Sequence, residues 1–104
     1  MTHPADLSLT ETVKAIALGT FSAVEVAEST LARIEARQPV LNCFIRVDPE
    51  GAMEAAKAAD AKRARGETLG PLHGAPLAHK DMYYRAGVTV TCGSALRRDF
   101  VPDV

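Results

Sequence analysis

Apolar residues recur every three or four positions through the first third of the chain, and this pattern predicts two helices. Two capping boxes, Ser8–Glu11 and Ser22–Glu25, mark where the helices begin, because the serine and glutamate of each box can exchange side-chain-to-backbone hydrogen bonds. The apolar positions behind them are Leu9, Val13, Ile16 and Ala17, then Val24, Ala27, Leu31 and Ile34. Gly19 suits a left-handed stop, and Pro39 marks the end of the second helix. We therefore expect a helical hairpin over residues 8–37.

The periodicity then changes from helical to alternating. Between residues 41 and 47 every second position is apolar or a cysteine, which predicts a short strand. Asp48 and Pro49 follow as a helix cap and a proline at the first helical position. The alanine-rich stretch behind them predicts a helix over residues 49–65, because alanine loses no side-chain entropy in a helix, and Gly66 ends it.

A turn-rich stretch comes next, with glycines and prolines at Gly70, Pro71, Gly74 and Pro76. Two short apolar runs, residues 77–80 and 88–92, are interpreted as strands separated by a loop. Helices that flank short apolar strands are typical of an α/β arrangement. The residues after Phe100 resemble the approach to another helix capped by Asp103, so we expect this chain to be a truncated part of a longer domain.

Composition narrows the classes of function. The chain has 104 residues, 47% hydrophobic and 24% charged, with a formal net charge of −1, which is ordinary for one small globular domain. This charge gives no reason to expect nucleic acid or an anionic membrane as a partner. No apolar stretch approaches the roughly 18 residues of a spanning helix, and the N-terminus lacks the pattern of a secretion signal. We expect a cytoplasmic protein.

Two cysteines, Cys43 and Cys92, suit isolated thiols in a reducing compartment, although a disulfide between them remains open. His73, His79 and Cys92 fit no common pattern of zinc ligands. We therefore expect neither a metal nor a cofactor.

Lys80 is the candidate for chemistry. It ends an apolar run, Leu77 and Ala78, where a charged ammonium costs free energy to desolvate. A lysine in such a place can be neutral and act as a general base, whereas a lysine at an open strand end is only a surface charge. Asp81 is interpreted either as an ion-pair partner of Lys80 or as a brace for the following loop. The brace is favoured, because successive strand residues point to opposite faces.

The run from residue 70 to residue 94 resembles the amidase signature family, whose members carry a segment close to G-P-L-x-G-V-P-x-x-x-K-D followed by G-x-x-T-T-x-G-S. The matching positions are Gly70, Pro71, Leu72, Gly74, Pro76, Lys80, Asp81, Gly87, Thr91, Gly93 and Ser94. Ala75, His79 and Val90 depart from the pattern, and none of them replaces the lysine. Over residues 8–66 the resemblance extends only to the pattern of helices.

The resemblance implies a Ser–cisSer–Lys mechanism, in which the lysine accepts a proton and a serine attacks an amide carbonyl. Lys80 is then the base. Both serines of the family lie in a Gly/Ser-rich segment further downstream, and we do not expect Ser8, Ser22, Ser29 or Ser94 to replace them. The implied fold is a mixed sheet covered by helices. Residues 1–104 would be the N-terminal part of one such domain, supplying its helices and first strands.

Three functions follow as hypotheses. The first is an amidase that hydrolyses the C–N bond of a small carboxamide. The second is the glutaminase subunit of a tRNA-dependent amidotransferase, which would work with partner subunits. The third is a non-enzymatic remnant or interaction module. The parent protein would be a homodimer or an assembly with partner subunits, and the 104-residue chain alone is expected to be inactive and either marginally stable or oligomeric.

Overall fold

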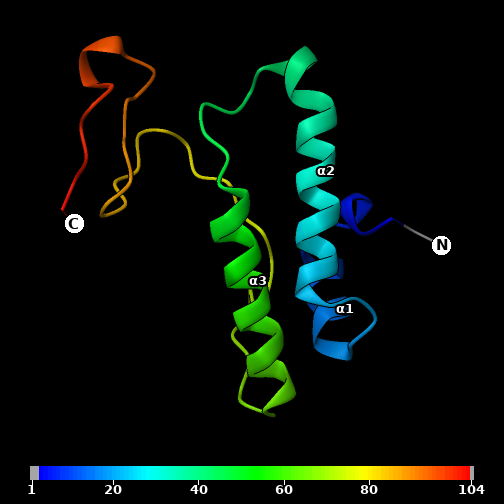
Figure 1. Ribbon diagram of the computed structural model, residues 1–104. Coiled ribbons are helices and arrows are strands. Elements are labelled where there is room, and N and C mark those ends of the chain that lie inside the picture. Colours follow the sequence, from blue (N-terminus) through cyan, green and yellow to red (C-terminus); the bar gives the residue numbers. More distant parts are fainter. Residues whose placement is uncertain (1–2, 104) are drawn as a thin grey trace.

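The computed structural model describes residues 3–103, and its regular elements are helical. The 3-10 turn η1 (Pro4–Asp6) precedes α1 (Leu9–Leu18), α2 (Ala23–Leu41) and α3 (Pro49–Ala64), and the 3-10 turn η2 (Ala95–Arg97) follows. α2 and α3 lie side by side, and α1 lies beside the first turns of α2 (Figure 1). After α3 the chain runs back along that helix and then extends to a separate loop cluster, residues 81–103 (Figure 1).

The two predicted capping boxes are confirmed. The Ser8 hydroxyl accepts the Glu11 N–H at 3.2 Å, and the Glu11 carboxylate accepts the Ser8 N–H at 3.0 Å. The same exchange between Ser22 and Glu25 has distances of 3.0 and 3.3 Å. α1 ends at Gly19, whose φ of 78° is left-handed, as predicted. The arrangement differs from a simple hairpin, because α2 packs mainly along α3 and against η1.

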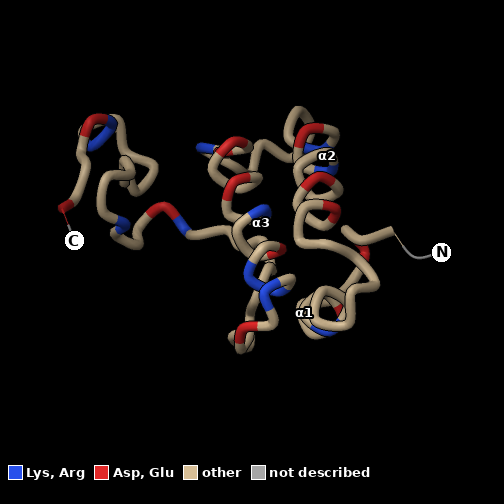
Figure 2. Tube along the Cα trace, turned by 60° about the horizontal axis from the view of Figure 1, so that its bottom comes forward, with Lys and Arg blue, Asp and Glu red and all other residues tan. Residues whose placement is uncertain are grey.

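The helix predicted over residues 49–65 is also confirmed. The Asp48 carboxylate accepts the Gly51 N–H at 3.0 Å, and Pro49 occupies the first helical position. Gly66 follows the last turn with a φ of 73°. Acidic and basic residues both occur along the helices (Figure 2).

The end predicted for the second helix is wrong. α2 continues through Pro39 to Leu41 and is capped by Asn42, whose φ of 46° is left-handed. Proline removes one backbone donor from a helix and crowds the preceding turn, but α2 continues past Pro39, and the Asn42 N–H donates to the Gln38 carbonyl at 2.8 Å. Asparagine tolerates the left-handed conformation better than most residues, which allows it to replace glycine at this helix end.

No strand occurs within residues 3–103, so the strands predicted at 41–47, 77–80 and 88–92 are absent from the part of the chain that the structure describes. The mixed sheet expected for an α/β fold is likewise absent from those residues. A strand needs a neighbouring strand to pair its backbone groups, and alternation in the sequence does not supply one. After α2 the Gln38 side chain takes that place, because it donates to the Phe44 carbonyl at 2.6 Å and accepts the Phe44 N–H at 3.1 Å.

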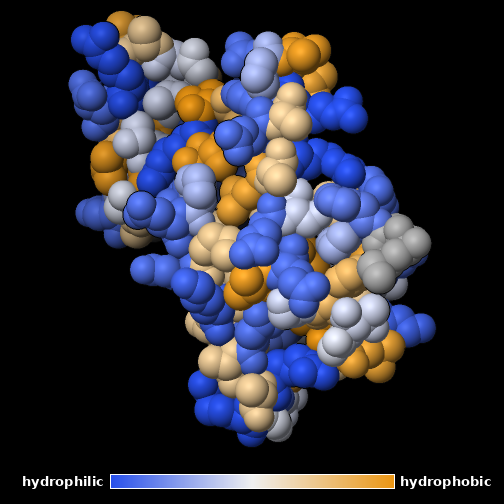
Figure 3. Space-filling model, turned by 45° about the vertical axis from the view of Figure 1, so that its right-hand side comes forward, coloured by the Kyte–Doolittle hydropathy of each residue, from blue (hydrophilic) through white to orange (hydrophobic). Residues whose placement is uncertain are grey.

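The hydrophobic core lies where the three helices meet. Its buried members come from all three: Ile16, Ala23, Val26, Ala27 and Ala56. Three of these five are alanines, whose small side chains let the helix backbones approach closely. On the face shown in Figure 3, apolar side chains also reach the surface in separate spots between polar ones.

One polar contact ties α3 to the beginning of α2. The Asp60 carboxylate accepts the N–H groups of Ala23 at 2.7 Å and Val24 at 3.1 Å. These are donors that a helix leaves without partners in its first turn, where a negative charge is also favoured by the helix dipole. With Ser22 bonded to the third N–H of the helix, the start of α2 is capped both locally and from α3.

Replacing Asp60 by alanine is therefore expected to destabilise the helical core by about 1–3 kcal/mol, the usual range for losing hydrogen bonds to a charged group. Asp60→Asn keeps one acceptor oxygen and should lose less. Urea denaturation followed by far-UV circular dichroism measures the change. Glu54→Ala is the control, because it removes an exposed carboxylate from the same helix. Equal unfolding midpoints for Asp60→Ala and Glu54→Ala would contradict the cap.

Candidate functional site

The first half of the 70–94 run is docked onto the helices. Gly74 has a φ of 80°, and a Cβ atom there would lie 3.1 Å from the Ile16 side chain and 3.2 Å from that of Ala23. The imidazole Nε2 of His73 lies 2.9 Å from the carbonyl oxygen of Ala59 in α3. Residues 73 and 74 thereby contact all three helices, and only glycine combines this backbone conformation with so close an approach.

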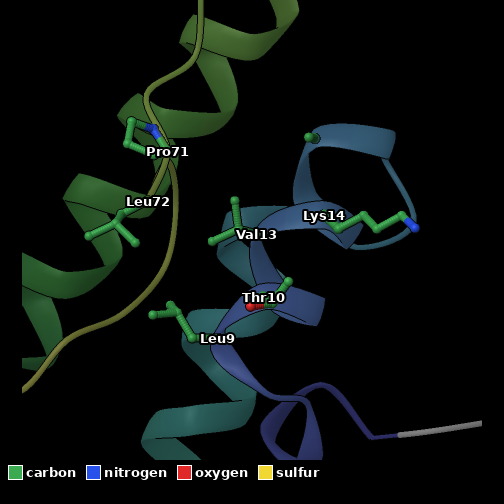
Figure 4. A pocket seen from close by; sticks show the side chains of 7 residues that line it. Leu9, Thr10, Val13, Lys14, Pro71 and Leu72 are labelled. Atoms are coloured by element: carbon green, nitrogen blue, oxygen red, sulfur yellow. The ribbon is translucent and has the colours of Figure 1, made fainter.

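Next to this docking point lies a shallow apolar groove. Leu9 and Val13 of α1 point toward Pro71 and Leu72 of the loop across it, and Lys14 extends away (Figure 4). The groove lies between α1 and the start of the 70–94 run. Among the described residues that line it, none is a titratable group aimed inward that would carry out chemistry.

Lys80 lies beyond the docked part, in the extended segment that leads to the loop cluster. Lys80, Leu77 and Ala78 are all exposed, and Leu77 is 63% exposed. The apolar surroundings expected around the lysine are therefore not formed within residues 3–103. The backbone turns at this point, because the Lys80 carbonyl accepts the N–H groups of Met82 at 2.7 Å and Tyr83 at 3.2 Å.

Asp81 braces the loop cluster, as the sequence favoured. Its carboxylate accepts the Thr91 N–H at 3.0 Å and also the Thr91 hydroxyl, which lies in close contact. These bonds, the one from the hydroxyl first, lower the pKa of Asp81 below its ordinary value, because they favour the charged form. Within residues 3–103 the ion pairs are Arg33–Asp6, Arg65–Glu67 and Arg98–Asp99, so Lys80 and Asp81 form no ion pair there.

Thr91 begins a tight turn. Cys92 and Gly93 both have left-handed φ values, 55° and 73°, and the Ser94 N–H donates to the Thr91 carbonyl at 2.9 Å. Two successive left-handed residues closed by such a bond form a type I′ turn. Inside the turn the Gly93 N–H donates to the Thr91 hydroxyl oxygen at 3.1 Å.

Each serine of the chain holds a hydrogen bond to the backbone. Ser8 and Ser22 cap helices, and Ser94 accepts the Leu96 N–H at 3.3 Å at the start of η2. Ser29 accepts the Ala5 N–H at 3.2 Å and lies 3.0 Å from His3. Among residues 3–103, none of these four hydroxyls is hydrogen-bonded to Lys80.

The sequence profile of the amidase family matches residues 25–104. The chain belongs to this family. A glutamyl-tRNA(Gln) amidotransferase subunit from Azoarcus sp. strain BH72 is 51% identical over 94 residues, which are 90% of this chain and 19% of that protein. The corresponding subunit from Chloroflexus aurantiacus is 42% identical over 102 residues, 98% of this chain and 21% of that protein.

A solved structure is also similar. It belongs to a vestigial protein complex described as revealing the evolutionary origins of an s-triazine catabolic enzyme, with a TM-score of 0.86 and 40% identity over 92% of this chain and 21% of that chain. The resemblance drawn from the 70–94 run is thus confirmed. The chain spans about a fifth of the length of the curated relatives it matches.

An aromatic cluster in this amidase-family chain was not predicted. The Arg97 guanidinium donates to the Tyr84 hydroxyl at 2.9 Å, and its Cζ lies 4.3 Å from the centroid of the Phe100 ring. The centroids of the Tyr84 and Phe100 rings are 5.4 Å apart. The cluster joins Tyr84 to Arg97, 13 positions further along the chain, and to Phe100, and no periodic pattern marks these residues.

Cys43 and Cys92 are both free thiols and exposed. Among residues 3–103 no three His, Cys, Asp or Glu side chains gather as metal ligands would. In the same residues no helix is both long and apolar enough to cross a membrane.

Proposed function

We propose that this chain supplies the general base, Lys80, of a site that hydrolyses a carboxamide C–N bond. The observation that carries the proposal is the 70–94 run, in which family residues flank Lys80 and hold the chain on both sides of it. On one side Gly74 rests on Ile16 and Ala23, and on the other Asp81 is bonded to Thr91. The family match includes this whole run.

By resemblance to the amidase signature, Lys80 accepts a proton through a serine in a cis peptide, and a second serine attacks the amide carbonyl. A serine hydroxyl is a weak nucleophile without such a base. Both serines would come from the Gly/Ser-rich segment of the family, and the apolar surroundings that Lys80 needs would come from contacts outside the described residues. The chain by itself is then inactive toward simple amides.

A second candidate is the glutaminase subunit of a tRNA-dependent amidotransferase. The observation that favours it is that both curated relatives cited above are glutamyl-tRNA(Gln) amidotransferase subunits, at 42–51% identity. In that case partner subunits would be required, and glutamine would be the amide. The two exposed free thiols suit a reducing compartment, so we place either form in the cytoplasm.

A chimera tests the proposal. The matching 94-residue segment of the Azoarcus protein is replaced by this chain's segment, and ammonia release from glutamine and from simple amides is measured. We expect activity within about tenfold of the host, because the segment supplies the same base in the same geometry. A folded chimera without activity would refute the proposal and favour a non-enzymatic role.

The same chimera separates the two candidates. The replaced segment is 19% of the host protein, so the rest of the host carries most of its subunit contacts, and loss of co-elution with the other host subunits in size-exclusion chromatography would count against the amidotransferase hypothesis. Hydrolysis of simple amides without assembly would favour a stand-alone amidase.

A further inference from the structure

Asp81, the residue next to Lys80, is the first residue of the loop cluster, and its side chain is bonded within that cluster. Asp81 receives two hydrogen bonds from Thr91, one from the backbone N–H and one from the hydroxyl. The Thr91 hydroxyl in turn accepts the Gly93 N–H at 3.1 Å. The hydroxyl is therefore oriented, because its proton goes to Asp81 and its lone pair receives the Gly93 N–H.

The turn that carries Thr91 is itself fixed. Val90, which precedes it, is 2% exposed, and its N–H donates to the Phe100 carbonyl at 3.0 Å. The Gly87 N–H donates to the carbonyl of Pro102, a buried residue, at 3.1 Å. Residues 87–90 are thus held against residues 100–102, and Thr91 extends from the packed part of the loop cluster.

We propose that the Asp81–Thr91 pair, here named the clamp, positions Lys80 for its role as base. This inference rests on the proposed function. The Asp81 side chain is held by the clamp, and the Lys80 carbonyl, which is part of the peptide bond between Lys80 and Asp81, accepts the N–H groups of Met82 and Tyr83. Both sets of bonds hold the backbone on the C-terminal side of Lys80, from which its exposed side chain extends.

Asp81 and Thr91 are positioning residues in this account, and they do not touch the reacting atoms. A misplacement of a catalytic group by about 1 Å can cost on the order of 100-fold in rate. The clamp should consequently affect the rate of the chemical step more than the binding of substrate.

Kinetics of the chimera described above test the proposal. Thr91→Val removes the hydroxyl at nearly constant volume, and we expect kcat to fall by about 10- to 100-fold with KM nearly unchanged. Thr91→Ser restores the hydroxyl and should restore kcat to within about threefold. Thr89→Val is the matched control, because Thr89 makes no hydrogen bond to Asp81 in residues 3–103. Unchanged kcat in folded Thr91→Val would overturn the proposal.

A second measurement uses the 104-residue chain and needs no activity. The clamp should keep the Asp81 amide, which belongs to the peptide bond after Lys80, rigid, with an NMR order parameter of about 0.85, and Thr91→Val should lower it toward about 0.6. Thr91→Ser should retain the high value. An order parameter that is low in the unmodified chain, or that Thr91→Val leaves unchanged, would refute the clamp.

The NMR chemical shift of the Thr91 amide, measured against pH on the same sample, provides a further check. The shift should change with the protonation of the Asp81 carboxyl group, whose pKa lies below the ordinary 3.8 of aspartate, and Asp81→Asn should abolish this titration. Because the pKa is lower in the folded chain, the clamp's contribution to stability is complete above pH 3.8. It is lost as the pH falls through the lower folded value. If the NMR measurements give the expected result but the unmodified chimera is inactive, the proposed function is wrong, whereas the Asp81–Thr91 clamp is supported as a structural feature.

Discussion

Lys80→Ala in the active chimera is expected to lower kcat by about 10²–10⁴-fold, the range that a positioned general base contributes. The fold should be nearly unchanged, because Lys80 is exposed and its side chain contributes little packing within residues 3–103. Lys80→Arg should be almost as damaging. A guanidinium stays protonated at any working pH, so it cannot accept the proton from serine. Steady-state kinetics with glutamine or a simple amide measure both effects.

Lys57 provides the control for this pair of variants. It is an exposed lysine on α3, and Lys57→Ala and Lys57→Arg should leave kcat within about twofold of the unmodified chimera, as is usual for surface positions. If Lys80→Arg kept more than about a tenth of kcat, Lys80 would act by its charge alone and would not be the base.

The helix starts could be predicted from the sequence because their causes are local. Ser8 and Glu11, like Ser22 and Glu25, lie three residues apart and satisfy each other's backbone donors without help from distant parts of the chain. The same holds for Asp48 at the start of α3. The predicted boundary at Pro39 was wrong. It was inferred from the free-energy penalty of proline inside a helix, and α2 nevertheless continues past Pro39 to the cap at Asn42.

The predicted strands failed for the opposite reason. Alternation of apolar residues says which face of a strand would be buried, but a strand exists only where another strand pairs with it. Over residues 41–47 the Gln38 side chain satisfies the Phe44 backbone groups instead. Over residues 88–92 only the Val90 N–H is bonded to the facing segment, at Phe100, which is too little to form a ladder.

In the candidate site, too, residues could be identified from the sequence but their distant partners could not. The family pattern identified Lys80, Gly74 and Asp81 as residues that match, and the brace by Asp81 was favoured from strand geometry. Their partners could not be read from the sequence. The contacts of Gly74 with α1 and α2 span more than 50 positions, and the carboxylate of Asp60 reaches the start of α2 from 36 and 37 positions away.

Gly74→Ala should cause the largest loss of stability among single substitutions in the docked segment. Its φ of 80° is left-handed, a conformation that costs an alanine roughly 1–2 kcal/mol. In addition, the new Cβ would lie 3.1 Å from Ile16 Cδ1 and 3.2 Å from Ala23 Cβ, and overpacking of this kind typically costs about 1–3 kcal/mol. Neither neighbour yields easily, since Ile16 is 1% exposed and Ala23 is fully buried in the core.

Gly66→Ala separates these two costs. Gly66 has a φ of 73°, close to that of Gly74, but a Cβ there would meet no atom within 4 Å. Urea denaturation of the 104-residue chain should therefore show a loss of about 1–2 kcal/mol for Gly66→Ala, which arises from the backbone alone. Gly74→Ala should lose about 1–3 kcal/mol more, the part due to the contacts with Ile16 and Ala23. Equal losses in the two variants would mean that residue 74 does not pack against the helices, and the docking of the 70–94 run onto α1 and α2 would then be wrong.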